Sequence, residues 1–350
     1  MPLFNSAPKS LCILRLSAIG DVCHAISVVQ AIQAHWPKTE ITWVCGKIEA
    51  QLISDLPNIR VVVFDKKLGF KGMRNVWKQL SSTRFDALLH MQAALRASAL
   101  SFGIKAKYKV GFGKNRTKEG QWLFTNKHLP KSDSFHVLDN FADFARFIGV
   151  PFNIPKWNIP LSEEDQNFAA SVIPDKTIII SPAASKDERN WIPERYAKIA
   201  DYVVSKGWNV ALCGSPSERE QHLGQQIIDS AKVPIINLIG KTNLKQLVAI
   251  IQHSQGVLAP DSGPAHIATT QSTPVIGLYA HSNPLRTGPY VDQDLVVSTY
   301  EIHIKNQNKA KLWGTRAKGS DLMRSITIDS VSEKIDILIK NNKLSDNKHG

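Results

Sequence analysis

Short apolar segments of strand-like composition alternate along this chain with segments whose apolar residues recur at helical spacing, and the alternation occurs twice. In the first half, strands are expected at 11–16, 41–45, 60–64, 87–91 and 108–112. Helices are expected between and after them, at 22–35, 49–55, 71–82, 93–102 and 137–148. Repeated β–α alternation predicts a parallel sheet with helices on both faces.

A Pro-rich stretch at 150–160 interrupts the alternation of strands and helices, and the alternation begins again in the second half of the chain. Strands are expected at 177–181, 209–213, 235–238, 256–259 and 274–279. Helices are expected at 193–206, 217–231, 243–253, 264–271 and about 329–341. The prediction is a doubly wound α/β domain at 1–155, a second at 156–328, and a C-terminal helix with a disordered polar tail at 329–350. Two such domains are expected to face a central cleft at the carboxyl ends of both sheets.

Composition places the chain among globular proteins, with 43% hydrophobic and 21% charged residues. No apolar run approaches the ~20 residues needed to cross a bilayer, and residues 1–9 lack the apolar core of a signal peptide. We therefore expect a cytoplasmic protein. The four cysteines, none in a CxxC pair, are expected to be buried free thiols: Cys12, Cys23, Cys45 and Cys213.

The formal net charge of +13 is large, and basic residues cluster at 66–78, 105–118 and 305–324. Such charge favours a polyanionic partner, which could be a nucleic acid, an anionic membrane face or a phosphorylated glycolipid. The alternative is a solvated surface that aids solubility. Residues 114–136 are basic and turn-rich, and we expect a mobile loop there rather than core.

Residues 257–270, VLAPDSGPAHIATT, read as a strand that ends at small residues and opens a helix. A helix start presents free backbone N–H groups and the positive end of the helix dipole. Asp261, Ser262 and His266 add polar side chains at that point. This is the local chemistry of an anion or nucleotide-diphosphate site, although an ordinary capped βα turn has the same appearance.

Three further strand-to-helix turns are candidates. Gly20-Asp21 directs a carboxylate to the predicted cleft, unless Asp21 is only the N-cap of its helix. The segment 181–191 carries Lys186 and Arg189, which could neutralise a departing diphosphate or form local ion pairs on a surface loop. The turn at 239–244 could rim a base pocket. There is no GxGxxG or GxxxxGK[ST] sequence and no histidine spacing typical of a metal site, so a metal-independent site is predicted.

Three of these segments together resemble the ADP-heptose:lipopolysaccharide heptosyltransferases of glycosyltransferase family 9: LRLSAIGDV at 14–22, the SPAASKDERNW loop at 181–191, and DSGPAH at 261–266. The resemblance covers about residues 10–340 and implies a GT-B fold of two Rossmann-like domains. The opening segment looks closer to the type that adds the first heptose to Kdo. Two positions depart from the pattern: Ser27 replaces a frequent proline, and one branch has lysine where Arg189 stands.

The resemblance implies inverting transfer of heptose from ADP-heptose to the lipopolysaccharide inner core, with Asp21 as general base. The donor would lie on the C-terminal domain, at Ser185, Lys186, Arg189, Thr242, Asp261, Ser262, Gly263 and His266. Basic residues of the first domain would hold the anionic acceptor: Lys66, Lys67, Lys114, Arg116 and Lys118. No cofactor, metal or nucleic acid is expected.

The implied partners are ADP-heptose and Kdo-lipid A or a later inner-core acceptor, met by a monomer bound peripherally at the inner face of the inner membrane. One alternative is a GT-B transferase or epimerase that uses another nucleotide-sugar. The second is a basic nucleic-acid-binding protein, against which the sequence shows no helix-turn-helix, zinc or RNP motif.

Overall fold

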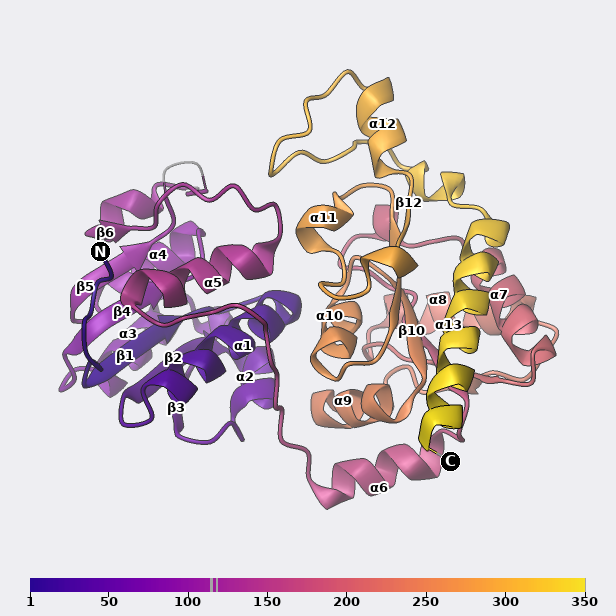
Figure 1. Cartoon of the computed structure of the whole chain (residues 1–350), viewed down its shortest axis with the longest axis horizontal. Coiled ribbons are helices and arrows are strands. Elements are labelled where there is room, and N and C mark those ends of the chain that lie inside the picture. Colours follow the sequence, from indigo (N-terminus) through magenta and orange to yellow (C-terminus); the bar gives the residue numbers. More distant parts are fainter. Residues whose placement is uncertain (114–115, 118, 350) are drawn as a thin grey trace. The chain divides into compact units, whose positions relative to one another are not determined.

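The chain forms two compact units, Met1–Pro160 and Leu161–Gly350. The sequence prediction places this division after residue 155. The computed structural model describes residues 1–113, 116–117 and 119–349 (Figure 1). Each unit is an α/β unit built on its own parallel sheet of six strands.

The N-terminal sheet has the strand order β3-β2-β1-β4-β5-β6, and all of its pairings are parallel. Its strands are β1 (Ser10–Leu14), β2 (Glu40–Gly46), β3 (Ile59–Phe64), β4 (Phe85–His90), β5 (Ala106–Gly111) and β6 (Lys127–His128). Its helices are α1 (Ile19–His35), α2 (Lys47–Ile53), α3 (Gly69–Gln79), α4 (Leu95–Phe102) and α5 (Val137–Ile148), with 3₁₀ turns η1 (Lys66–Leu68) and η2 (Gln121–Phe124).

Helices cover both faces of this sheet, because successive strand side chains point to opposite faces. Cys12 and Leu14 of β1 share one core cluster with Val76 of α3 and Leu100 of α4. On the other face, α1 and α5 lie side by side (Figure 1). The turns that follow β1 and β4 are therefore held between packed layers.

The C-terminal sheet has the order β12-β11-β10-β7-β8-β9. Its strands are β7 (Thr177–Ile180), β8 (Asn209–Leu212), β9 (Ile236–Asn237), β10 (Gly256–Pro260), β11 (Val275–Tyr279) and β12 (Val297–Ser298). Its helices are α6 (Glu163–Val172), α7 (Pro193–Ser205), α8 (Glu218–Ser230), α9 (Leu244–His253), α10 (Gly263–Thr270), α11 (Pro284–Thr287), α12 (Tyr300–Asn306) and α13 (Ile328–His349), with η3 (Asp187–Arg189), η4 (Gln293–Leu295) and η5 (Leu322–Ser325).

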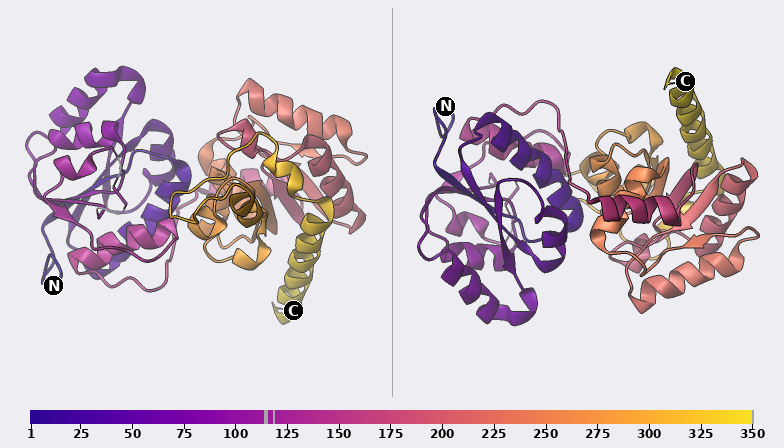
Figure 2. Two further views of the ribbon diagram at one scale, coloured as in Figure 1. Left: turned by 90° about the horizontal axis from the view of Figure 1, so that it is seen from above. Right: turned by 90° about the horizontal axis from the view of Figure 1, so that it is seen from below.

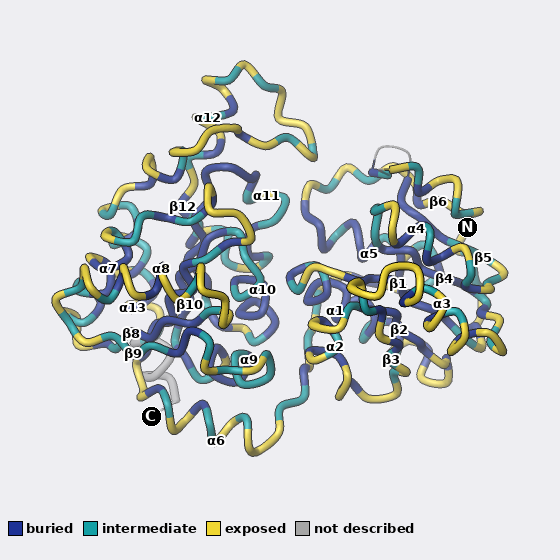
Figure 3. Tube along the Cα trace, turned by 180° about the vertical axis from the view of Figure 1, so that it is seen from behind, coloured by how far each residue is buried: buried dark blue, intermediate teal, exposed yellow. Residues whose placement is uncertain are grey.

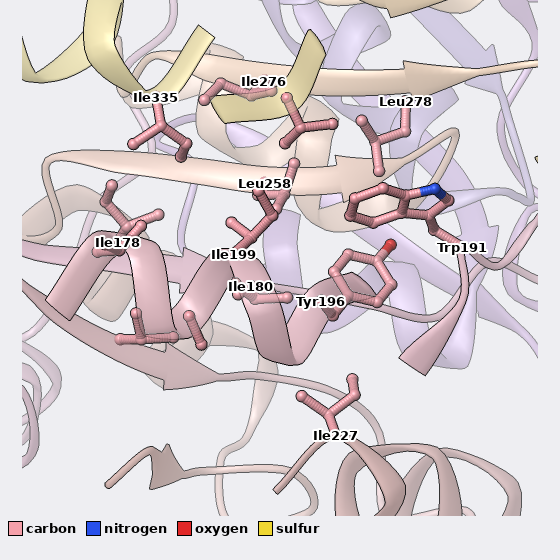
Figure 4. Packing of buried hydrophobic residues seen from close by; sticks show 14 of the residues in the cluster. Ile178, Ile180, Trp191, Tyr196, Ile199, Ile227, Leu258, Ile276, Leu278 and Ile335 are labelled. Atoms are coloured by element: carbon pink, nitrogen blue, oxygen red, sulfur yellow. The ribbon is translucent and has the colours of Figure 1, made fainter. Parts of the chain in front are cut away.

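The core of the C-terminal unit joins the central strands to α7, α8 and α13 (Figure 4). Trp191 and Tyr196 pack edge to face with ring centroids 5.2 Å apart, and both are fully buried. The indole of Trp191 donates to the carbonyl oxygen of Ile326 at 3.1 Å. These contacts hold the C-terminal end of the 181–191 segment in place, so the residues before Trp191 are attached to a fixed position in the core.

Several segments differ from the sequence prediction, among them β12, α11 and α12, where no strand or helix was predicted. α6 was not predicted; it is mostly exposed (Figure 3), and Ser162 caps it by accepting a hydrogen bond from the Asp165 N–H at 3.1 Å. Within 114–136 the described residues form η2 and β6, and Gln121 is fully buried there, so this segment is not a simple loop. α13 continues to His349, whereas the sequence predicts its end near 341 and a disordered tail beyond (Figure 2). No proline or glycine interrupts 328–349.

All four cysteines are buried and free, as predicted. Burial raises the pKa of each thiol, which keeps it protonated and inert. No helix among residues 1–113, 116–117 and 119–349 has the length and apolarity needed to span a bilayer.

Candidate active site

The turn between β1 and α1 presents a carboxylate. α1 starts at Ile19, so Asp21 is its third residue rather than its N-cap. The Asp21 carboxylate lies 3.4 Å from the backbone N–H of Ala18 and accepts a hydrogen bond from Arg15. Its side chain is 32% exposed. Asp21 is therefore held at a helix start with one oxygen engaged by a cation, and solvent still reaches the carboxyl group.

Arg15 is itself fixed from several sides. Its Nη1 donates to the carbonyl oxygen of Met91 at 2.6 Å, and its guanidinium lies 5.2 Å from the ring centroid of Phe141. Burial lowers the pKa of Arg15, while the charges of Asp21 and Glu49 raise it. Arg15 lies within the 14–22 segment that resembles the family. The sequence alone gave no indication that its side chain would pair with Asp21.

Residues after β4 support the same turn. The Gln92 side-chain oxygen accepts the N–H of Leu16 at 2.7 Å. Gln121 of η2 donates to the carbonyl oxygen of His90 at 2.8 Å. The first contact joins the ends of β1 and β4, and the second joins η2 to β4. Both link residues that are far apart in sequence, so no local pattern could have revealed them.

In the C-terminal unit the turn between β10 and α10 has the predicted form. Ser262 is the N-cap of α10 and makes no side-chain capping bond. Its hydroxyl is buried, and no partner for it lies in the described part of the chain. His266 is buried in the first turns of the same helix. The start of α10 thus combines free N–H groups with a buried hydroxyl.

Asp261 links this turn to the 181–191 segment. Arg189 lies with Nη1 3.3 Å from its Oδ2, and both side chains are about nine-tenths buried. The Nη2 of Arg189 donates to the hydroxyl of Ser185. The cation expected to face a diphosphate is therefore already paired, and a bound anion would compete with Asp261 for it.

Arg219, at the start of α8, fixes the same segment from outside. It donates to the carbonyl oxygen of Ala184 at 2.9 Å and pairs with Asp187. Asn190 accepts the N–H of Ala184 at 2.7 Å. Sequence analysis missed Arg219, because it lies outside the matching segments.

The turn after β11 adds three consecutive buried polar residues, His281, Ser282 and Asn283. Ser282 donates its hydroxyl to Asp261 Oδ2 at 2.8 Å. β11 neighbours β10 in the sheet, so both turns open on the same edge. Sequence analysis missed these residues, although a polar run directly after the apolar strand 274–279 was the available signal.

Two predicted donor residues lie apart from this network. Lys186 is exposed and 3.9 Å from Glu188. Thr242 is half-buried after Gly240, whose φ of +75° turns the chain before Asn243 caps α9. The structure thus brings Ser185, Arg189 and Asp261 together and leaves Lys186 and Thr242 at separate positions.

The predicted acceptor cations have different surroundings. Lys66 and Lys67 are exposed in η1, directly after β3. Arg116 is buried and donates to the carbonyl oxygens of Ser132 and Ser134 at 3.2 and 2.7 Å. Lys114 and Lys118 lie outside the described residues. Of the predicted acceptor cations that lie in the described ranges, Lys66 and Lys67 are exposed beside a strand end and Arg116 is not.

No group of three or more His, Cys, Asp or Glu residues within the described ranges could hold a metal ion. The metal-independent reaction remains a prediction.

Comparison with known families decides the class of this site. The profile of glycosyltransferase family 9 (heptosyltransferase) matches residues 73–315. The chain belongs to glycosyltransferase family 9. It is therefore a glycosyltransferase, and the predicted family resemblance is confirmed.

A relative within the family is the lipopolysaccharide core heptosyltransferase OpsX of Haemophilus influenzae, 52% identical over 337 residues, or 95% of this chain and 97% of the relative. Two solved structures share the fold. The family 9 glycosyl transferase of Veillonella parvula has a TM-score of 0.79 at 23% identity, covering 97% of this chain and 99% of that one. ADP-heptose lipopolysaccharide heptosyltransferase II of Escherichia coli has a TM-score of 0.75 at 19% identity, covering 96% and 99%. The predicted GT-B fold class is thus confirmed.

Proposed function

We propose that this glycosyltransferase moves L-glycero-D-manno-heptose from ADP-heptose to Kdo in the inner core of lipopolysaccharide, with inversion at the anomeric carbon. The observation that carries the proposal is the 52% identity, over nearly the whole of both chains, to a lipopolysaccharide core heptosyltransferase. The name of the Escherichia coli structural relative, an ADP-heptose lipopolysaccharide heptosyltransferase, supports the donor.

Asp21 is the proposed general base. As the acceptor hydroxyl attacks the anomeric carbon, its proton passes to the exposed carboxylate of Asp21. An alcohol is a far weaker acid than a carboxylic acid of ordinary pKa ~3.9, so proton transfer must accompany bond formation. The hydrogen bond from Arg15 holds the carboxylate in one orientation.

The C-terminal unit is the proposed donor site. Free N–H groups at the start of α10, at Ser262 and Gly263, together with the Ser262 hydroxyl, would bind the diphosphate. Arg189 and Lys186 would stabilise the charge that develops on ADP as its bond to the sugar breaks. Ser185, Thr242, Asp261 and His266 complete the proposed set.

Lys66 and Lys67 are the proposed acceptor contacts, because they are exposed beside a strand end and carry charge opposite to Kdo carboxylates. Charge reversal of both is expected to raise the acceptor KM and leave the donor KM unchanged. Lys114 and Lys118 stay in the proposal as the second basic cluster, whereas Arg116 does not, because it is buried and bonded to backbone carbonyl oxygens. A monomer working at the cytoplasmic face of the inner membrane is part of the same proposal.

The deciding experiment is mass spectrometry of truncated lipopolysaccharide acceptors incubated with ADP-heptose, and with UDP- and GDP-sugars as controls. The expected product is a Kdo-terminated acceptor that gains one heptose only with ADP-heptose. Transfer to an acceptor that already carries heptose, with none to Kdo, would replace the first-heptose assignment. Turnover of another nucleotide-sugar in place of ADP-heptose would overturn the donor.

A further inference from the structure

One surface of the N-terminal unit exposes large apolar side chains that the proposed reaction does not use. They come from α3, α4 and η2, and each is more than half exposed: Phe70, Leu95, Phe102, Trp122 and Leu123. Phe102 and Leu123 reach 77% and 68%. Single exposed apolar residues are ordinary, but a contiguous group marks an interaction surface.

Contacts join the three elements that carry this group, because α4 packs on η2 and α3 is bonded to α4. Phe102 and Leu123 line one shallow pocket. The indole of Trp77 in α3 donates to the carbonyl oxygen of Leu100 in α4 at 2.8 Å, and its ring lies 5.7 Å from that of Phe70. We call the surface formed by Phe70, Leu95, Phe102, Trp122 and Leu123 the α3–α4 surface.

The charges on α3, α4 and η2 themselves have one sign, and one carboxylate lies beside them: Glu119 accepts a hydrogen bond from the N–H of Leu95 at 2.6 Å. Residues 69–79, 95–102 and 121–124 contain no aspartate or glutamate. They contain four cations, all exposed: Lys71, Arg74, Lys78 and Arg96. Lys109 lines the pocket with Phe102 and donates to the carbonyl oxygen of Ser101 at 2.7 Å. Exposed apolar and aromatic side chains among cations fit the headgroup region of an anionic bilayer.

We propose that the α3–α4 surface docks the enzyme on an anionic phospholipid bilayer, with Phe102, Trp122 and Leu123 entering the interface and the cations pairing with lipid phosphates. The proposal rests on the proposed function, since an acceptor with acyl chains lies in a membrane and must be met there. Trp is a side chain that favours the membrane–water boundary, because it is amphipathic.

Two other occupants fit less well. A second copy joined through this surface by a two-fold axis would set the same cations against one another. Single-stranded nucleic acid would stack its bases on the three aromatic side chains of this group, but Leu95 and Leu123 offer no stacking face.

The test is co-sedimentation with vesicles of phosphatidylethanolamine and phosphatidylglycerol, compared with vesicles of phosphatidylcholine alone. The wild-type enzyme is expected to bind the anionic vesicles and not to bind the neutral ones. Trp122→Ser with Leu123→Ser, and separately Lys71→Glu with Arg74→Glu, are expected to weaken binding about tenfold or more. Matched controls are Ile154→Ser with Leu312→Ser, also exposed, and Lys198→Glu with Lys232→Glu.

Heptosyl transfer to a deacylated, water-soluble acceptor separates this proposal from the proposed function. The surface variants are expected to keep wild-type turnover on that acceptor, which also shows that they fold. Equal binding to both kinds of vesicle, equal binding by surface and control variants, or a dimer that Trp122→Ser with Leu123→Ser disrupts would each overturn the proposal. Absence of transfer with intact vesicle binding would overturn only the proposed function.

Discussion

Arg15 donates a hydrogen bond to the carboxylate of Asp21, six residues further along the chain, and so closes the turn between β1 and α1. The two side chains are not equally accessible, because the exposed fractions are 10% for Arg15 and 32% for Asp21. Arg15 is thus the buried, fixed partner, and the carboxylate of Asp21 is the group that solvent can reach. This asymmetry suits a base that must meet a substrate while its orientation is maintained.

Replacing Asp21 tests its role in the reaction. Asp21→Asn keeps the size of the side chain and removes its basicity. We expect kcat to fall about 10²–10⁴-fold, the usual contribution of a general base. The affinity for ADP should stay unchanged, which isothermal titration measures. Equal losses of kcat and of ADP affinity would instead make Asp21 a structural residue of the turn.

Gly46, at the end of β2, lies against the same turn and leaves no room for a larger side chain. A Cβ added there would lie 2.6 Å from the carbonyl oxygen of Leu16 and 2.4 Å from Oε2 of Glu49. Since Leu16 lies between Arg15 and the α1 start, Gly46→Ala should displace the turn. We expect a loss of stability of about 1–3 kcal/mol, as for other overpacked sites, and a lower kcat.

The double variant Gly46→Ala with Glu49→Ala tests the cause. It removes the side-chain obstacle and leaves the backbone one, so activity should remain low. Full recovery of kcat would show that Glu49, and not the Leu16 carbonyl, sets the requirement for glycine.

Sequence patterns predicted most of this fold because its elements are local. α5 was predicted at its observed limits, since apolar side chains at helical spacing define it and Gly149 ends it in the left-handed region. The Asp261 turn was likewise found from adjacent residues. Ser282 was not, because its bond to Asp261 depends on β11 lying beside β10. Arg116 was predicted to bind the acceptor, and only tertiary packing shows it buried among backbone carbonyl oxygens.

Arg189 is expected to need its guanidinium group. Nη1 faces Asp261 while Nη2 donates to Ser185, an arrangement that the single ammonium of lysine cannot reproduce. We expect Arg189→Lys to raise the donor KM about tenfold, equivalent to about 1.4 kcal/mol, with acceptor KM unchanged. Steady-state kinetics with each substrate varied in turn measures both. Ser282→Ala, which removes one bond to Asp261, should have a smaller effect in the same direction; unchanged donor KM in both variants would contradict the network.

His90, at the end of β4, should make the enzyme sensitive to acid. It is fully buried, and within the described residues neither ring nitrogen has a hydrogen-bond partner. Burial lowers its pKa from 6.5 to about 3. Below pH 6.5 the unfolded chain therefore binds a proton at His90 and the folded chain does not. The free energy of unfolding falls as the pH drops below 6.5. For one such group the loss between pH 6.5 and 5.5 is about 1 kcal/mol.

His90→Leu should remove this loss, because leucine is apolar and its introduction leaves no partner unpaired. The free energy of unfolding in urea, measured at pH 6.5 and 5.5, should fall by about 1 kcal/mol less in the variant than in the wild type. His222→Leu, at an exposed histidine, controls for the introduction of leucine. The same pH dependence in the wild type and in His90→Leu would show that His90 is protonated in the folded enzyme or that other groups dominate its acid response.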